Sequence, residues 1–328
     1  MSKQHIVYFD FLRGIAILMV IGIHTYVAGD FLSNDGIVRI LLRQSLNCAV
    51  PIFLALSGFL LGRKEFDTRN SIMAFWKNQI PKVYIPCLIW SIPWFLYSVM
   101  WGGKSIDSQL INLLVGGFSI YYFIALIIQY YLLLPFLQKW PRVMLVCSVM
   151  VSAISITIIT YLNSIKGLQL PLILYAGPFV TWIVFYMLGV YYSQRNREYS
   201  LTRVWCLILI GFVLECIETY YLNTNFGGGV GIKLSSFIYS FGIILLVLNS
   251  KVQLMYRENH FTSFITYIGK ISFGVYLTHC YVITLVSKIY PISSWFMSFG
   301  EVTFLTILLV TLSRKIFPEC INKYIGFL

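Results

Sequence analysis

Tyr8–Thr25 reads YFDFLRGIAILMVIGIHT, an apolar run that is long enough for a membrane helix but carries Asp10, Arg13 and His24. Arg13 and His24 are eleven residues apart in the sequence. That spacing is about three helical turns, so both lie on one helix face, ~16 Å apart along the axis. A charge in a lipid-embedded helix costs at least ~2.5–3.5 kcal/mol, and such side chains usually face a bundle interior or an aqueous cavity. The pattern therefore predicts a polar, functional face.

Plainer interpretations of these residues stay open at this stage. Arg13 could extend to the inner lipid headgroups, and His24 could hydrogen-bond a neighbouring helix. The N-terminal position also resembles that of a signal peptide. Asp10, Arg13 and the lack of a convincing small-residue cleavage site favour a helix that is retained.

The composition is that of a polytopic membrane protein. The chain has 328 residues, of which 59% are hydrophobic and 11% are charged, whereas about a quarter of a soluble domain is charged. Apolar runs of about twenty residues, each enough to cross a ~30 Å hydrocarbon core, recur along the sequence. We expect an all-α membrane helix bundle, with 1–328 as a single transmembrane domain and no appended soluble domain. The ten expected spans are 9–29, 45–62, 82–101, 119–138, 143–162, 175–193, 203–222, 234–250, 271–289 and 297–314.

The distribution of positive charge predicts the orientation. An even number of spans puts both termini on one side. If that side is the cytoplasm, 18 of the 24 Lys and Arg residues lie inside and 6 lie outside, as the positive-inside rule requires. Topology thus explains the net charge of +12, and no nucleic-acid partner is expected. The seven cysteines form no CxxC pair, so neither a disulfide framework nor a metal site is indicated.

Polar residues near the outer side could contact a substrate. Arg39, Arg43 and Asn47 follow one another at spacings of four, which places them on one helix face. Two guanidinium groups there could hold an anionic acceptor such as a lipid-linked sugar phosphate, although snorkelling at the interface explains them equally well. Gln129, inside IALIIQYYLLLP, also needs a partner in lipid. Most such residues tie helices together, but we include Gln129 among the candidate substrate contacts.

Two further spans carry candidate catalytic groups. Glu215 and Glu218 are adjacent on the helix in GFVLECIETYYL, and Glu215 lies deeper in the span, where it could pair with an arginine or orient a histidine. In KISFGVYLTHCYV, Ser272, Tyr276 and His279 share one face. A basic segment between the second and third spans could bind a phosphate-bearing donor, although topology alone also predicts it; its candidate residues are Arg63, Lys64, Lys77 and Lys82.

The motifs resemble those of the acyltransferase-3 family of integral-membrane acyltransferases. RGIAILMVIGIH is similar to the family signature, in which ten residues separate an arginine from a histidine. PIFLALSGFLLG, FWKNQIPKVYIP, YYFIALIIQYYLLLP and ISFGVYLTHC resemble other family stretches, so the match covers essentially the whole chain. Two departures stand out. Lys77 and Lys82 replace the usual arginines, and the extracytoplasmic hydrolase-like domain that some members append is not expected here.

The resemblance implies an O-acetyltransferase of the bacterial inner membrane. The donor would be acetyl-CoA on the cytoplasmic side, and the acceptor a hydroxyl of a surface glycan or lipid-linked sugar outside. His24 would act as general base or transient acyl carrier, and Arg13 would bind the CoA phosphates or orient the thioester, positioned by Asp10. Glu215 and His279 are further catalytic candidates. Whether the chain forms homo-oligomers or needs an envelope partner protein stays open.

The main alternative is a transporter or flippase for a glycan or an anionic metabolite. The same charged residues would then line a pathway. Against this alternative, the sequence has no internal repeat and no matching pair of broken helices in its two halves.

Overall fold

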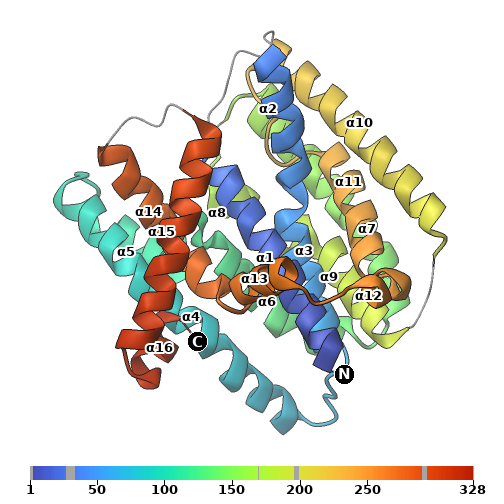
Figure 1. Ribbon diagram of the computed structural model, residues 1–328, viewed down its shortest axis with the longest axis horizontal. Helices are drawn as coiled ribbons and strands as arrows, with labels where there is room; N and C mark the ends of the chain where they lie inside the picture. Colours follow the sequence, from blue (N-terminus) through green and yellow to red (C-terminus); the bar gives the residue numbers. More distant parts are fainter. Residues whose placement is uncertain (1–2, 27–33, 169, 196–198, 290–293, 328) are drawn as a thin grey trace.

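The computed structural model describes residues 3–26, 34–168, 170–195, 199–289 and 294–327. Within these ranges every regular element is a helix, which confirms the all-α class (Figure 1). The helices are α1 (Lys3–His24), α2 (Asn34–Ser45), η1 (Leu46–Cys48), α3 (Ala49–Leu61), α4 (Arg69–Met100), α5 (Ile106–Val115), η2 (Ser119–Tyr121), α6 (Tyr122–Leu137), α7 (Pro141–Thr160), η3 (Tyr161–Ile165), α8 (Leu172–Tyr175), α9 (Phe179–Gln194), α10 (Leu201–Phe226), α11 (Leu234–Val247), α12 (Ser250–Met255), α13 (His260–Lys270), α14 (Ser272–Ile289), α15 (Trp295–Ile316) and α16 (Glu319–Ile325).

The described helices are those of a polytopic membrane protein, but ten spans are not confirmed. Six helical stretches are long and apolar enough to cross a membrane: Val7–His24, Gly36–Leu61, Arg69–Met100, Ser119–Leu137, Pro141–Ile165 and Trp295–Ile316. A seventh span exists if α13 and α14, bent by 78° at their junction, count as one. The expected span 175–193 corresponds to α9, whose 16 residues extend only about 24 Å.

Two stretches differ from the expected boundaries for local reasons. The helix expected at 82–101 begins at Arg69, because Thr68 forms a capping box with Ser71 and prolongs the helix toward the basic segment. Pro81, Pro86 and Pro93 lie inside this helix without ending it. The span expected at 45–62 is formed by η1 and α3, and α2, which ends at Ser45, precedes it, so Arg39 and Arg43 sit on a separate helix.

Glycine pairs allow the closest helix crossings. A Cβ on Gly58 of α3 would lie 2.2 Å from the Tyr186 carbonyl oxygen, and one on Gly189 of α9 would lie 2.0 Å from that of Ala55. Such distances leave no room for a side chain. Small residues such as Gly58 therefore let α3 and α9 approach closely.

The same arrangement joins α1 to α13. A Cβ on Gly14 would lie 2.0 Å from the Ile265 carbonyl oxygen, and one on Gly269 would lie 1.7 Å from that of Asp10. Gly211 of α10 and Gly242 of α11 form a third close crossing. The helices that carry the polar residues are therefore in direct backbone contact.

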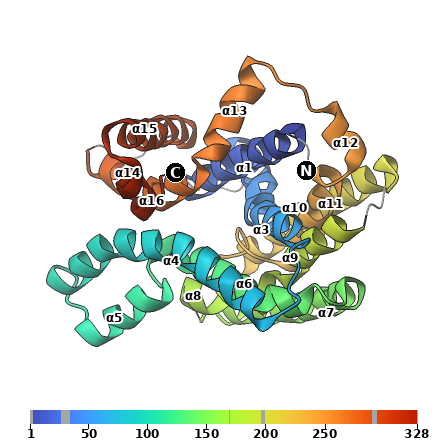
Figure 2. The same cartoon turned by 90° about the horizontal axis from the view of Figure 1, so that it is seen from below.

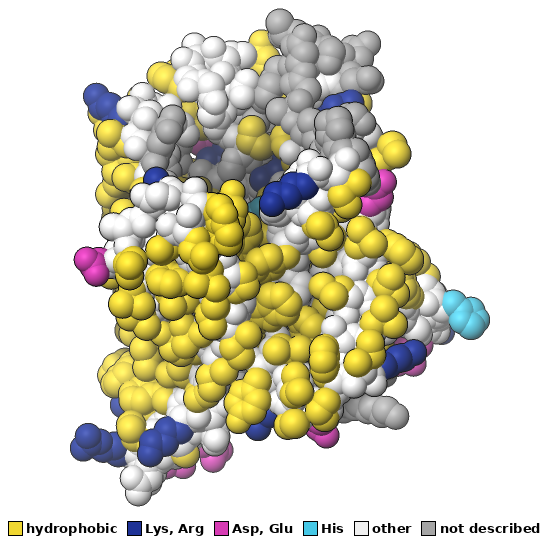
Figure 3. All heavy atoms as spheres, turned by 90° about the vertical axis from the view of Figure 1, so that its left-hand side faces the viewer, with side chains coloured by type: hydrophobic (Ala, Val, Ile, Leu, Met, Phe, Trp, Pro, Cys, Tyr) yellow, Lys and Arg dark blue, Asp and Glu magenta, His cyan; other side chains and the backbone are white. Residues whose placement is uncertain are grey.

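The arrangement of the helices puts α1 and α3 in the middle of the molecule. Viewed from below, they lie between α13–α16 on one side and α6, α7 and α9 on the other (Figure 2). The start of α1 and the helix α16 lie toward the same, lower side (Figure 1). A broad hydrophobic band covers the face formed by α5 and α15, with charged side chains above and below it (Figure 3). Exposed leucines of α15 contribute to the apolar surface: Leu305, Leu308, Leu309 and Leu312.

Candidate active site

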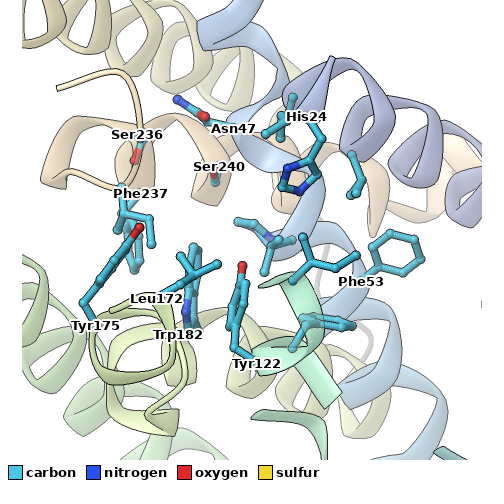
Figure 4. A pocket seen from close by; sticks show the side chains of 18 of the residues that line it. His24, Asn47, Phe53, Tyr122, Leu172, Tyr175, Trp182, Ser236, Phe237 and Ser240 are labelled. Carbon is cyan, nitrogen blue, oxygen red and sulfur yellow. The ribbon is translucent and has the colours of Figure 1, made fainter. Parts of the chain in front are cut away.

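A cavity of about 240 Å³, here called the outer cavity, lies at the end of α1 that carries His24 (Figure 4). The His24 ring is directed into this outer cavity, which explains why its side chain is exposed although it lies deep in the bundle. Aromatic and hydroxyl side chains line it together with aliphatic ones. The aromatic and hydroxyl side chains labelled in Figure 4 are Phe53, Tyr122, Tyr175, Trp182, Ser236, Phe237 and Ser240.

His279 is the neighbour of His24. The centroids of the two rings are 5.4 Å apart, and the His279 side chain is fully buried. Its Nδ1 lies 3.1 Å from the Val275 carbonyl oxygen and 2.9 Å from that of Tyr276. Because carbonyl oxygens only accept, Nδ1 carries a proton, and in the neutral ring Nε2 is an acceptor. Nε2 has no partner among the described residues, so the ring offers a fixed lone pair beside His24.

A buried polar network supports one side of the outer cavity. Arg43, 7% exposed, donates to Asn47 Oδ1 at 2.6 Å, and both residues line the cavity. Asn47 Nδ2 donates to Glu215 Oε1 at 2.5 Å and to Gln44 Oε1 at 2.9 Å. Lys233 Nζ lies 3.3 Å from the same Glu215 oxygen, and both side chains are fully buried. The network therefore holds Asn47 between a cation and an anion.

A second, inner cavity of about 410 Å³ contains Arg13. Arg13 donates to Asp10 at 2.9 Å, as the sequence suggested, and its side chain is 36% exposed. Lys270, at the break between α13 and α14, and Gln79 of α4 line the same cavity. Two cations thus face one hollow, and the close crossing of α1 with α13 brings them there.

The other four residues predicted to bind the donor do not line the inner cavity. Arg63 and Lys64 line a separate open hollow of about 520 Å³ that follows the inner cavity along the end of α3. Arg63 donates to the Ser193 carbonyl, and Lys64 lies 4.9 Å from the centre of the Phe75 ring. Lys77 and Lys82 are exposed on α4 and line none of the three hollows.

Of the four residues predicted to contact the acceptor, only two line the outer cavity. Arg43 and Asn47 share one helix face, as their spacing predicted, and both reach the outer cavity; Arg39 does not line it. The Gln129 side-chain amide is hydrogen-bonded to the backbone: it donates to the Gly177 carbonyl at 2.8 Å and accepts from the Phe179 amide at 3.1 Å. This geometry is that of a helix tie, and the substrate contact predicted for Gln129 gains no support from it.

Two lysines were not predicted as site residues. Lys233 was counted as an ordinary outer charge, yet it is the partner of Glu215 for which an arginine or histidine was expected. Its position just after the glycine-rich turn at 227–231, which reads GGGVG, gave no indication that the side chain is buried. Lys270 was counted as an inner charge that flanks a span. The spacing of Gly269 and Gly14 could have suggested a close crossing, but only the fold brings Lys270 to Arg13.

Comparison with known proteins identifies the chemistry at the level of a family. The family described as "Acyltransferase domain", Acyl_transf_3, matches residues 6–313. The chain belongs to the acyltransferase-3 family. This chain is also similar to a curated protein of Bacillus subtilis (strain 168) named "Putative membrane-bound acyltransferase YfiQ". The two are 24% identical over 259 residues, which cover 73% of this chain and 69% of the relative. No solved structure matches the chain.

Membership of the acyltransferase-3 family agrees with the chemistry available in the two cavities. An acyl transfer requires a base and an acyl donor site, and His24 and Arg13 supply an imidazole and a cation at two depths of one helix. Among the described residues, no group of three or more His, Cys, Asp or Glu side chains could hold a metal ion.

Proposed function

We propose that this protein is a membrane-embedded O-acyltransferase that moves an acetyl group from cytoplasmic acetyl-CoA to a hydroxyl of an extracytoplasmic or lipid-linked surface glycan. Its membrane would be the plasma membrane of a bacterium. The observation that carries the proposal is the pair of cavities along α1, one with Arg13 and the other with His24. A two-substrate transfer across a membrane needs a donor site and an acceptor site at different depths.

The inner cavity supports binding of a phosphate-bearing donor. Arg13 and Lys270 line it together, and guanidinium and ammonium groups are the usual partners of phosphate oxygens. The adjoining open hollow adds Arg63, Lys64 and Lys139 at the same end of α3. These cations offer room and charge for the nucleotide part of CoA beside the cavity that receives its thioester arm.

The lining of the outer cavity supports a sugar acceptor. Trp182, Tyr122 and Tyr175 present rings on which the apolar face of a sugar can stack. The Tyr122 and Tyr175 hydroxyls can hydrogen-bond sugar hydroxyls, whereas the Trp182 N–H already donates to the Ala176 carbonyl at 2.8 Å. The buried Ser240 hydroxyl has no partner among the described residues and is available to a ligand. A volume of about 240 Å³ lies below the ~300–1,000 Å³ of pockets for drug-sized ligands. It suits one sugar ring.

The reaction assigns distinct tasks to the two histidines. The acceptor oxygen attacks the thioester carbonyl carbon while His24 takes the hydroxyl proton, so a C–O bond forms. The C–S bond then breaks, and the proton passes from His24 to the departing sulfur to give free CoA thiol. His279 Nε2 can accept from an N–H of His24, which would orient the base as the third group of a catalytic triad does.

The first test measures transfer of radiolabelled acetyl from acetyl-CoA into envelope glycan, by membranes that contain the protein. We expect His24→Ala and Arg13→Ala to lose transfer at normal protein levels. His260→Ala and Arg142→Ala remove an exposed histidine and an exposed arginine outside all three hollows, and are the matched controls. Full activity of both site variants would overturn the proposal.

The same assay separates the two versions of the mechanism and the transport alternative. Acetyl trapped on His24 would make it the acyl carrier, whereas release of acetyl only onto the acceptor supports the general-base version. Movement of a glycan or metabolite that needs no acetyl-CoA would instead support a transporter.

A further inference from the structure

The outer and inner cavities share three side chains, all aromatic: Phe53 of α3, Phe123 of α6 and Tyr276 of α14. We propose that these three rings, here called the aromatic wall, form a barrier through which the acyl group must pass, and that the wall limits transfer to short acyl chains. This inference rests on the proposed acyl transfer and adds a determinant of acyl length to it.

The ring contacts form a continuous row. The Phe53 and Phe123 centroids are 6.1 Å apart, and those of Phe123 and Tyr276 are 5.7 Å apart, each pair in an edge-to-face arrangement. Phe123 is therefore the middle member. Such edge-to-face contacts are favourable by about 0.5–1.5 kcal/mol beyond the burial of area. They are weak enough for one ring to swing aside.

The members of the aromatic wall are anchored unequally. The Tyr276 hydroxyl donates to the Ile120 carbonyl at 2.5 Å, which fixes that ring, and its side chain is 9% exposed. Phe53 and Phe123 are half-buried and have no polar atom to anchor them. A passage through the wall would thus open by rotation of the phenylalanines, against a tyrosine that stays in place.

The aromatic wall lies between the cavity of His24 and the cavity of Arg13. Arg13 lines only the inner cavity and His24 only the outer cavity, and α1 separates them by ~16 Å. A thioester carbonyl that reaches His24 while its phosphates stay near Arg13 must lie across the wall. The rings then enclose the acyl group and the thioester arm.

Acyl length follows from this enclosure. Each added methylene has to fit among rings that already touch, and a pocket of fixed size discriminates by about 10–200-fold for one methylene. Loss of the middle ring would provide the missing space. The wall should therefore favour acetyl over longer acyl groups, and smaller residues at 123 or 53 should relax that preference.

The test compares acetyl-CoA with butyryl-CoA as donors for the full-length protein in membranes. We expect Phe123→Ala and Phe53→Ala to raise the ratio of kcat/KM for butyryl-CoA to that for acetyl-CoA by at least tenfold. Phe123→Leu, which keeps more of the volume, covers the case that Phe123→Ala does not fold. Phe212→Ala is the matched control, because Phe212 is a half-buried ring that packs against Tyr239 outside both cavities. An unchanged ratio in folded wall variants would overturn the inference.

A labelling experiment tests the barrier without any turnover. Ser57→Cys places a thiol in the inner cavity and Ser240→Cys places one in the outer cavity. A small membrane-impermeant thiol reagent is added to sealed vesicles of either orientation, with the seven native cysteines of the parent chain as background. With the wall intact, each new thiol should react from one side only, and from opposite sides.

The expected effect of opening the wall is access from both sides. In the Phe123→Ala background, the thiol at 57 should become reactive also from the side that labels the thiol at 240. Access from one side only, as in the parent, would contradict a barrier made of these rings. If the parent transfers no acyl group at all, the proposed function fails, yet the labelling pattern still decides whether the aromatic wall separates two compartments.

Discussion

His24 and His279 lie with their ring centroids 5.4 Å apart, and His279 is locked by two backbone carbonyls so that its free nitrogen can only accept in the neutral state. We expect His24→Ala to lower kcat by about 10²–10⁴-fold, the range for loss of a general base. His279→Ala should lower kcat by a smaller factor and leave KM for the acyl donor unchanged.

A rescue experiment distinguishes positioning from packing at residue 279. The Gln side chain can place an acceptor oxygen near the position of Nε2, so His279→Gln should recover part of the activity that His279→Ala loses. The pH profile of kcat should shift in His279→Ala because the base has lost its orienting partner. Equal losses in both variants with an unchanged profile would mean that His279 only fills space.

Arg13, which Asp10 holds in the inner cavity, should contribute to binding of the acyl donor. A hydrogen bond to a charged group contributes ~1.5–3 kcal/mol, so Arg13→Ala should raise KM for acetyl-CoA by about 10- to 150-fold. Arg13→Lys should recover only part of this loss, because an ammonium lacks the fork of the guanidinium. Steady-state kinetics with Arg142→Ala as control would measure KM for acetyl-CoA. An unchanged KM for Arg13→Ala would refute the role of Arg13 in donor binding.

The buried pair of Glu215 and Lys233 predicts a stability effect. Removing one member leaves an uncompensated buried charge, which costs about 3–5 kcal/mol. Glu215→Gln and Lys233→Met should each lower the unfolding temperature in detergent by more than the double variant does. Additive losses in the double variant, measured by thermal unfolding, would show that the ion pair is not coupled.

The crossing of α1 with α13 predicts intolerance of a single methyl group. A Cβ on Gly269 would lie 1.7 Å from a backbone oxygen, so Gly269→Ala must push two helices apart, near or beyond the upper end of the ~1–3 kcal/mol typical of overpacking. Gly300 of α15 has nothing within 4 Å of its Cβ position and provides the control. Detergent-solubilised yield and thermal unfolding would compare Gly269→Ala with Gly300→Ala. Equal stability would contradict the crossing.

The sequence predicted those features that depend on helical phase and composition. Apolar runs gave the helical membrane class, and spacings of three or four residues gave the bonds Arg13–Asp10 and Arg43–Asn47. Each of these pairs is local in the sequence. Helical periodicity therefore fixes them before any tertiary contact is known.

Helical periodicity could not predict contacts between segments that are distant in the sequence. Glu215 and Lys233 meet only because a glycine-rich turn returns the chain, and His24 meets His279 across 255 positions. The break after Lys270 was read as the plain start of a span, because no proline or glycine cluster marks a 78° bend there. No local pattern in the sequence distinguished the half-buried Asn47, which lines a cavity, from the exposed Lys77, which does not.

The backbone contacts at Gly14, Gly58, Gly189 and Gly269 limit how the molecule can move during a catalytic cycle. Helices that touch without intervening side chains cannot slide past one another without losing van der Waals contact along their length. A rocking motion, of the kind that carries a whole solute across a membrane, would break these crossings. The turning of individual rings breaks none of these crossings, and under the proposed acyl transfer it would admit a small group attached to a tether.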